Sequence, residues 1–154
     1  MSILSLFRRR SRLFTPEESR AIVDAIRGAE QKTSGEVRVF VESRCRYMDA
    51  LDRAAEVFFN LEMDETKERN AVLVYVALKD HQLALFADEG IHTRAGSDYW
   101  QKEVDIMIDR VAKENIACGI AGCVNDIGEA LHTFFPYKND TDKNELPDEI
   151  VFGK

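Results

Sequence analysis

The amino-acid sequence predicts an α/β fold in which a small mixed sheet carries helices on both faces. Three observations lead to this prediction. Apolar residues recur at helical spacing in four segments, one alternating segment and two apolar runs separate the helices, and the two runs are joined by a very short turn. With 154 residues, of which 45% are hydrophobic and 32% are charged, the chain suits a single globular domain.

The first predicted helix has a clear start in the sequence. Thr15 can cap it, Pro16 fits its first position and Glu18 completes a capping box. Apolar residues then repeat at helical spacing until a serine-glycine pair interrupts the pattern. A strand follows at residues 36–42, where valine alternates with charged and aromatic residues.

The middle of the chain predicts a second helix and two further strands. Residues 48–61 place apolar side chains on one helical stripe, so this segment can cross from the first strand to the next. Residues 71–78 (AVLVYVAL) are apolar on both faces, which is typical of a central strand covered from both sides. The apolar run LALFAD follows after only four residues, and so short a connection requires an antiparallel hairpin.

Two helices are expected in the last third of the chain. One begins at Ser97 or Asp98, and the other runs from about Ala117 to Phe134, where Pro136 ends the pattern. The predicted order is therefore helix, strand, helix, strand, strand, helix, helix. A right-handed crossover makes the first two strands parallel, and the hairpin adds an antiparallel third.

The two ends of the chain are predicted to lie outside the domain. We assign residues 1–13 to a basic tail, residues 14–136 to one domain, and residues 137–154 to a polar tail that covers the domain without regular structure. No apolar run approaches the roughly 20 residues needed to span a bilayer. Residues 2–7 (SILSLF) are too short for the core of a signal peptide, so we expect a cytoplasmic protein.

Charge is unevenly distributed along the sequence. The net charge is −7, yet Arg8, Arg9, Arg10 and Arg12 make the first residues basic. Such a tail can touch anionic lipid or nucleic acid through phosphate contacts. No other basic stretch continues it, and the acidic remainder repels nucleic acid and favours cations. We therefore expect the protein to bind a divalent cation, to make weak membrane contact through the arginines and not to bind nucleic acid. We also expect a monomer with an unidentified protein partner.

Carboxylates gather around the predicted hairpin. The tight turn brings Asn70 opposite Asp88 and Glu89, and a parallel first strand brings Glu36 to the same edge. Asp98 could return there as the next helix begins. Oxygen ligands of this kind suit Ca²⁺ or Mg²⁺, so we predict a metal site from these five residues, with calcium as the leading ion. The residues also allow simpler roles, in which Asp98 caps a helix, Glu89 is solvated in a turn and Glu36 faces water.

The sequence contains no clear catalytic motif. It lacks a G-x-S-x-G elbow, a P-loop and a dinucleotide-binding fingerprint. The three histidines are far apart, and the three cysteines form no C-x-x-C pair, which argues against zinc and against a disulfide framework. We predict no catalytic residues and leave open whether the protein is an enzyme.

Three segments, TSGEVRVFVES, ERNAVLVYVALKD and FADEGIH, resemble the TPM domain family in their order and spacing. That family is shared by a thylakoid acid-phosphatase-like protein, photosystem-repair proteins and many bacterial proteins. The resemblance spans about residues 14–136 and is similar to the small bacterial single-domain form without signal peptide or membrane anchor. It implies a three-layer α/β/α sandwich with Rossmann-like character and a divalent-cation site at one sheet edge. It carries over Gly35, Glu36, Asn70 and the turn at residues 88–90.

The sequence departs from the family pattern in two places. Asn70 is followed by Ala71, where many members have glycine, and ADEGIH replaces the usual glycine-tyrosine-glycine turn.

The sequence leaves three functions open. The first is a non-catalytic, cation-binding interaction module. The second is a metal-dependent acid phosphatase, in which the cation polarises a phosphoryl oxygen. The third is a membrane-surface adaptor that docks through RRRSR, with SILSLF as an apolar contact.

Overall fold

The computed structural model describes residues 13–137 and 149–153. These residues form helices and strands with the following bounds: α2 (Pro16–Glu30), β1 (Glu36–Glu42), α3 (Ala50–Asn60), the 3-10 helix η1 (Met63–Glu65), β2 (Ala71–Ala77), β3 (Gln82–Ala87), α4 (Glu89–Ala95), α5 (Ser97–Lys113), α6 (Ile116–Phe134) and β4 (Ile150–Phe152). The strands form one sheet in the order β3-β2-β1-β4. The predicted α/β fold with a mixed sheet is confirmed.

The sheet combines parallel and antiparallel pairs, as the sequence predicts. β1 pairs with β2 in parallel, with Glu36 opposite Ala71 and Glu42 opposite Ala77. β3 pairs with the other side of β2 in antiparallel register, with Val72 opposite Ala87. The starts of β1 and β2 therefore lie at one end of the sheet, next to the end of β3.

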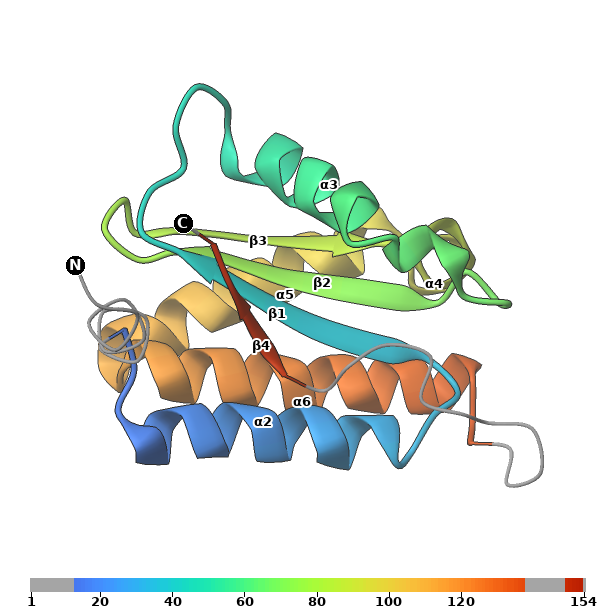
Figure 1. The fold of residues 1–154 in the computed structure, drawn as a ribbon. Helices are drawn as coiled ribbons and strands as arrows, with labels where there is room; N and C mark the ends of the chain where they lie inside the picture. The colour runs from blue at the N-terminus through green and yellow to red at the C-terminus, as the bar shows by residue number, and fades with distance from the viewer. Residues whose placement is uncertain (1–12, 138–148, 154) are drawn as a thin grey trace, which may run out of the picture.

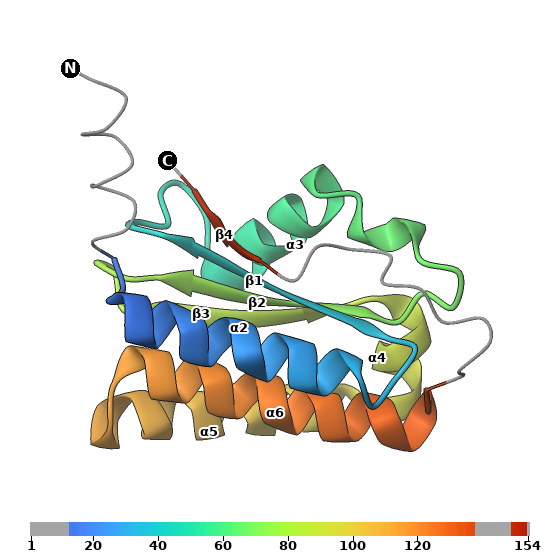
Figure 2. The same cartoon turned by 60° about the horizontal axis from the view of Figure 1, so that its bottom comes forward.

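Helices cover both faces of the sheet and make three layers (Figure 1). α2, α5 and α6 lie on one face, and α3 lies on the other, as the turned view shows (Figure 2). The valines of β1 and β2 pack against the apolar faces of α2 and α6. Phe40, Leu73 and Tyr75 point the opposite way and pack with Ala54 and Phe58 of α3. Both central strands are buried along their whole length, because each has a helix layer on either side.

The start of α2 is set by local sequence. The Thr15 hydroxyl accepts a hydrogen bond from the backbone N–H of Glu18 at 3.1 Å, and the Glu18 carboxylate accepts one from the Thr15 N–H at 2.9 Å. The predicted capping box is therefore present. It satisfies two N–H groups that the first turn of a helix otherwise leaves without a partner.

Two short elements differ from the sequence prediction. The polar tail was expected to lack regular structure, but its residues 150–152 form β4 in parallel with β1, where Val39 lies opposite Ile150. β4 pairs with the otherwise open edge of β1, whose backbone groups need partners. The sequence also predicts a turn at residues 88–90. This prediction is wrong, because residues 89–95 form the helix α4.

Other expectations concern cysteines and membranes. Cys45, Cys118 and Cys123 are all free thiols, in agreement with the absence of a disulfide pattern in the sequence. Among the helices that the structure describes, none combines the length and the apolar composition needed to cross a bilayer. The arginines of the basic tail precede residue 13 and lie outside the described residues.

A buried acid lies between α5 and α6. Glu103 of α5 is only 4% exposed, and its neighbour on α6 is Asp126, which forms an ion pair with Arg110 at 2.8 Å. Burial, and then the neighbouring Asp126 carboxylate, raise the pKa of Glu103 to about 8. The folded protein therefore holds a proton on this side chain at pH values where the unfolded chain has lost it.

This raised pKa predicts that the protein loses stability as the pH rises through neutrality. The native state binds the Glu103 proton up to about pH 8, whereas an unperturbed glutamate releases it near 4.5, so the free energy of unfolding falls between these values. Glu103→Gln cannot ionise and is expected to remove this slope. At about pH 8, the free energy of unfolding of this variant should exceed that of the wild type by at least about 1.4 kcal/mol, the equivalent of a one-unit pKa shift.

Urea unfolding at several pH values across this window measures the effect. The exposed Glu114→Gln serves as the matched control and should leave the slope as it is in the wild type. A Glu103→Gln slope equal to that of the wild type would contradict the assignment of the proton to Glu103.

Candidate functional site

The backbones of three polar residues meet where β1 and β2 start and β3 ends. Glu36 donates its backbone N–H to the carbonyl of Asn70 at 3.4 Å, and Asp88 donates its N–H to the carbonyl of Ala71 at 2.9 Å. Glu36, Asn70 and Asp88 are all at most 3% exposed, which is unusual for such side chains. We call these three residues the sheet-edge cluster.

Asp88 makes more contacts than the other two. Its Oδ1 accepts a hydrogen bond from the Glu89 N–H at 2.8 Å and so caps α4. Arg69 donates to both carboxylate oxygens, through Nε to Oδ2 at 2.7 Å and through Nη2 to Oδ1 at 2.8 Å. These hydrogen bonds to Asp88 raise the pKa of Arg69. The buried carboxylate is thus balanced by one two-pronged arginine contact.

The segment before β2 places Arg69 for this contact. Arg69 has a backbone φ of 53°, in the left-handed region, and its carbonyl accepts the Gly90 N–H at 2.8 Å. A Cβ at Gly90 would lie 2.2 Å from the Glu68 carbonyl oxygen and 2.5 Å from that of Arg69. Glycine is therefore required at position 90, because the first turn of α4 packs directly on the backbone of residues 68 and 69.

Asn70 has one satisfied and one unsatisfied side-chain atom. Its Nδ2 donates to the Ser34 hydroxyl at 3.3 Å, and its backbone N–H donates to the Thr66 hydroxyl at 3.2 Å. Its Oδ1 is buried and accepts no hydrogen bond from the described residues. A buried oxygen without a partner costs about 1–3 kcal/mol, so Oδ1 is an atom at which a bound cation or water would be favourable.

The other two residues predicted to bind metal are arranged differently. Glu89 is next to the cluster, but its side chain is 71% exposed and pairs with Arg69 at 3.3 Å. Asp98 is exposed in the first turn of α5, where Gly96 and not Asp98 occupies the cap position. In the part of the chain that the structure describes, no three His, Cys, Asp or Glu side chains are grouped as ligands of a metal ion. The five-residue metal site stays a prediction.

Arg69 is the residue of this region that the sequence prediction missed. The sequence does contain a signal, because an arginine immediately precedes Asn70 and a buried carboxylate such as Asp88 needs a nearby positive charge. The signal is weak, since arginines are also common before strands as solvated residues.

Comparison with known proteins places the chain among relatives of the same fold. The TPM domain model matches residues 8–130. The BA42 protein from the psychrophilic bacterium Bizionia argentinensis shares 41% sequence identity with this chain. Its solution structure superimposes with a TM-score of 0.83, and the match covers 91% of this chain and 95% of that one. The N-terminal domain of a P. gingivalis protein shares the fold at 14% identity, with a TM-score of 0.66 and 82% of each chain covered. No curated protein sequence matches the chain.

The packing of Gly90 gives a direct test of this geometry. Gly90→Ala should lower the free energy of unfolding by about 1–3 kcal/mol, because the added methyl group must displace the backbone of residues 68 and 69. Gly28→Ala is the matched control, since nothing lies within 4 Å of a Cβ there and Gly28 is inside α2. It should raise stability by about 0.5–1 kcal/mol. Urea unfolding measures the free energy of unfolding of both variants. Equal changes in the two variants would contradict the contact between Gly90 and the backbone of residues 68 and 69.

Proposed function

The chain belongs to the TPM domain family. We propose that it is a non-catalytic interaction module that binds a divalent cation through the sheet-edge cluster, with calcium as the leading ion. The observation that carries this proposal is the buried Oδ1 of Asn70, which accepts no hydrogen bond from the described residues. Asn70 immediately precedes Ala71, the first residue of β2, whose carbonyl accepts the Asp88 N–H. A cation at this place would satisfy an oxygen that is costly to bury alone.

The donor chemistry of the cluster fits a hard cation. Glu36 and Asp88 supply carboxylates, and Asn70 supplies an amide oxygen. Ca²⁺ takes oxygen ligands of these kinds and completes its shell of about 6–8 ligands with backbone carbonyls and water. Glu89 adjoins the cluster and could supply a further carboxylate from the surface.

Arg69 competes with a cation for the same carboxylate. Both oxygens of Asp88 accept hydrogen bonds from Arg69, so an ion that uses Asp88 must displace the guanidinium. The Arg69 side chain is 38% exposed, which allows it to turn toward solvent without opening the core. Calcium binding would then exchange one positive partner of Asp88 for another.

This competition predicts an unusual effect of an arginine substitution. Arg69→Gln should tighten Ca²⁺ binding by about five- to tenfold, because the ion no longer displaces a charged partner. Asp88→Asn should weaken binding by at least about tenfold, because the amide keeps the cap of α4 but loses the charge. Isothermal titration with Ca²⁺ and Mg²⁺ measures both changes.

Asp24→Asn is the matched control for the loss of one negative charge, since Asp24 is exposed on α2. It should leave calcium affinity as in the wild type. Absence of heat at millimolar Ca²⁺ in the wild type and in Arg69→Gln would refute the proposal. A loss in Asp24→Asn as large as in Asp88→Asn would reduce the effect to general electrostatic attraction.

A metal-dependent acid phosphatase and a membrane-surface adaptor are the alternatives that the sequence also predicts. For the first, a cation at the cluster would polarise a phosphoryl oxygen. Turnover of p-nitrophenyl phosphate that disappears in Asp88→Asn would favour it. For the second, cosedimentation with anionic liposomes that is lost when the chain starts at Leu13 would favour docking through the arginine tail.

A further inference from the structure

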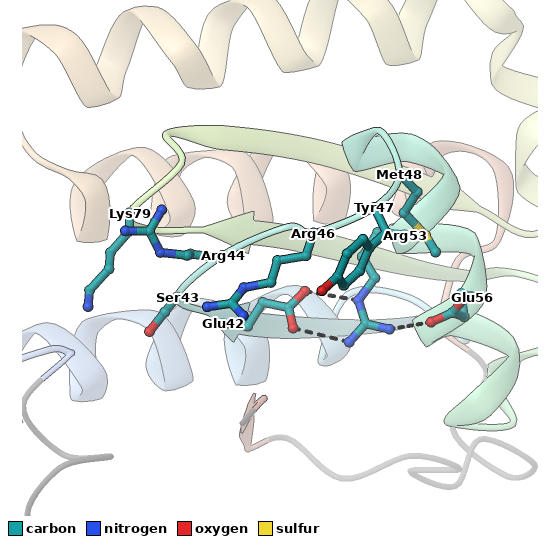
Figure 3. A pocket seen from close by; sticks show the side chains of 9 residues that line it. All are labelled: Glu42, Ser43, Arg44, Arg46, Tyr47, Met48, Arg53, Glu56 and Lys79. Atoms are coloured by element: carbon teal, nitrogen blue, oxygen red, sulfur yellow. Dashed lines mark hydrogen bonds and ion pairs between the residues drawn. The ribbon is translucent and has the colours of Figure 1, made fainter.

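A pocket of about 480 Å³ lies at the opposite end of the sheet from the sheet-edge cluster, where β1 and β2 end (Figure 3). Its walls come from the β1–α3 connection, from α3 and from the turn after β2. Its volume falls within the range of about 300–1,000 Å³ that is typical of small-molecule sites.

The topology of the sheet makes this end the expected place for a ligand. In open α/β sheets, ligands bind beyond the carboxyl ends of parallel strands. β1 and β2 are parallel, and the pocket opens beyond their carboxyl ends, where β1 continues toward α3.

The floor of the pocket is a hydrogen-bonded network around one arginine. Glu42 is only 5% exposed and accepts hydrogen bonds from Arg53 Nε at 2.9 Å and from Arg53 Nη2 at 3.1 Å. The Tyr75 hydroxyl donates to the same carboxylate, and Arg53 also pairs with Glu56. Figure 3 shows Arg53 between the two carboxylates. Arg53 thus balances one of the two carboxylates, and the floor keeps one net negative charge, which the two unpaired cations of the rim exceed.

The rim of the pocket, in contrast, is basic. Arg44 forms an ion pair with Asp80 at 3.4 Å, and Asp80 also accepts the Cys45 N–H at 2.7 Å. Arg46 and Lys79 line the pocket, and neither forms an ion pair with any described residue. The chain as a whole carries a net charge of −7, so these two cations mark a local reversal of sign.

Two further groups complete the rim. Ser43 lines the pocket beside Glu42 and brings a hydroxyl, which can donate to an anion. Tyr47 is 98% exposed and lies next to Arg46 at the mouth, as Figure 3 shows. A flat aromatic ring in this position can stack on the ring of a ligand.

We propose that this pocket binds a small phosphorylated molecule with a planar ring, whose phosphoryl group contacts Arg46 and Lys79 and whose ring stacks on Tyr47. Two cations match a group that carries up to two negative charges, and the arginine fork fits phosphate oxygens in pairs. This inference is independent of the cation proposal, because the two places lie at opposite ends of the strands.

Adenosine monophosphate is a suitable probe, with inorganic phosphate and adenosine as its two halves. We expect saturable binding of the nucleotide to the full chain, tighter than that of either half, in titrations followed by calorimetry or by NMR. Arg46→Gln and Lys79→Gln should each weaken it by about tenfold, because each removes one charged contact to the phosphoryl group. Tyr47→Ala should weaken binding of the nucleotide but not that of inorganic phosphate.

Lys102→Gln is the matched control, since Lys102 is exposed on α5 and does not line the pocket. It should bind the nucleotide as the wild type does, and so should Asp88→Asn at the other end of the sheet. Three results would overturn the proposal: absence of saturable nucleotide binding at millimolar concentration, adenosine binding as tight as that of the nucleotide, or an equal loss in Lys102→Gln.

Discussion

β1 and β2 run side by side in parallel, with Glu36 opposite Ala71 at one end and Glu42 opposite Ala77 at the other. A parallel pair cannot be closed by a tight turn, so the chain must cross over one face of the sheet, and α3 supplies that crossover. Both strands are buried on both faces, which in turn requires the layer of α2, α5 and α6 on the other side. The pairing also collects the strand starts at one end and the strand ends at the other.

The two ends of this pair have different chemistry, although each contains a buried carboxylate held by one arginine. At the strand starts, Arg69 holds Asp88 from a side chain that is 38% exposed. At the strand ends, Arg53 holds Glu42 and is 24% exposed, and Tyr75 donates to the same carboxylate. The first arginine has room to leave, whereas the second is fixed by additional partners. This contrast supports an exchangeable cation at one end and a rigid pocket floor at the other.

Much of the fold could be read from the sequence because its signals are local. The capping box of α2 needs only residues 15–18, and the hairpin of β2 and β3 follows from two apolar runs with a short turn between them. The hairpin register also follows from that turn, and it is what brings Asn70 beside residues 88 and 89. β4 left no such signal, because three residues are too few for a period and their strand forms only against the edge of β1.

The sequence by itself thus determined the α/β class and the mixed sheet, since both depend on hydrophobic periodicity and on short connections. It also determined the family, through three sequence segments in their order and spacing. The tertiary structure alone decided which charges meet. The pairing of Arg69 with Asp88 requires a left-handed backbone at position 69 and the close packing of Gly90. The basic pocket requires that two loops far apart in the chain meet beyond β1 and β2. Such contacts join residues that no local pattern relates, so only the folded chain reveals them.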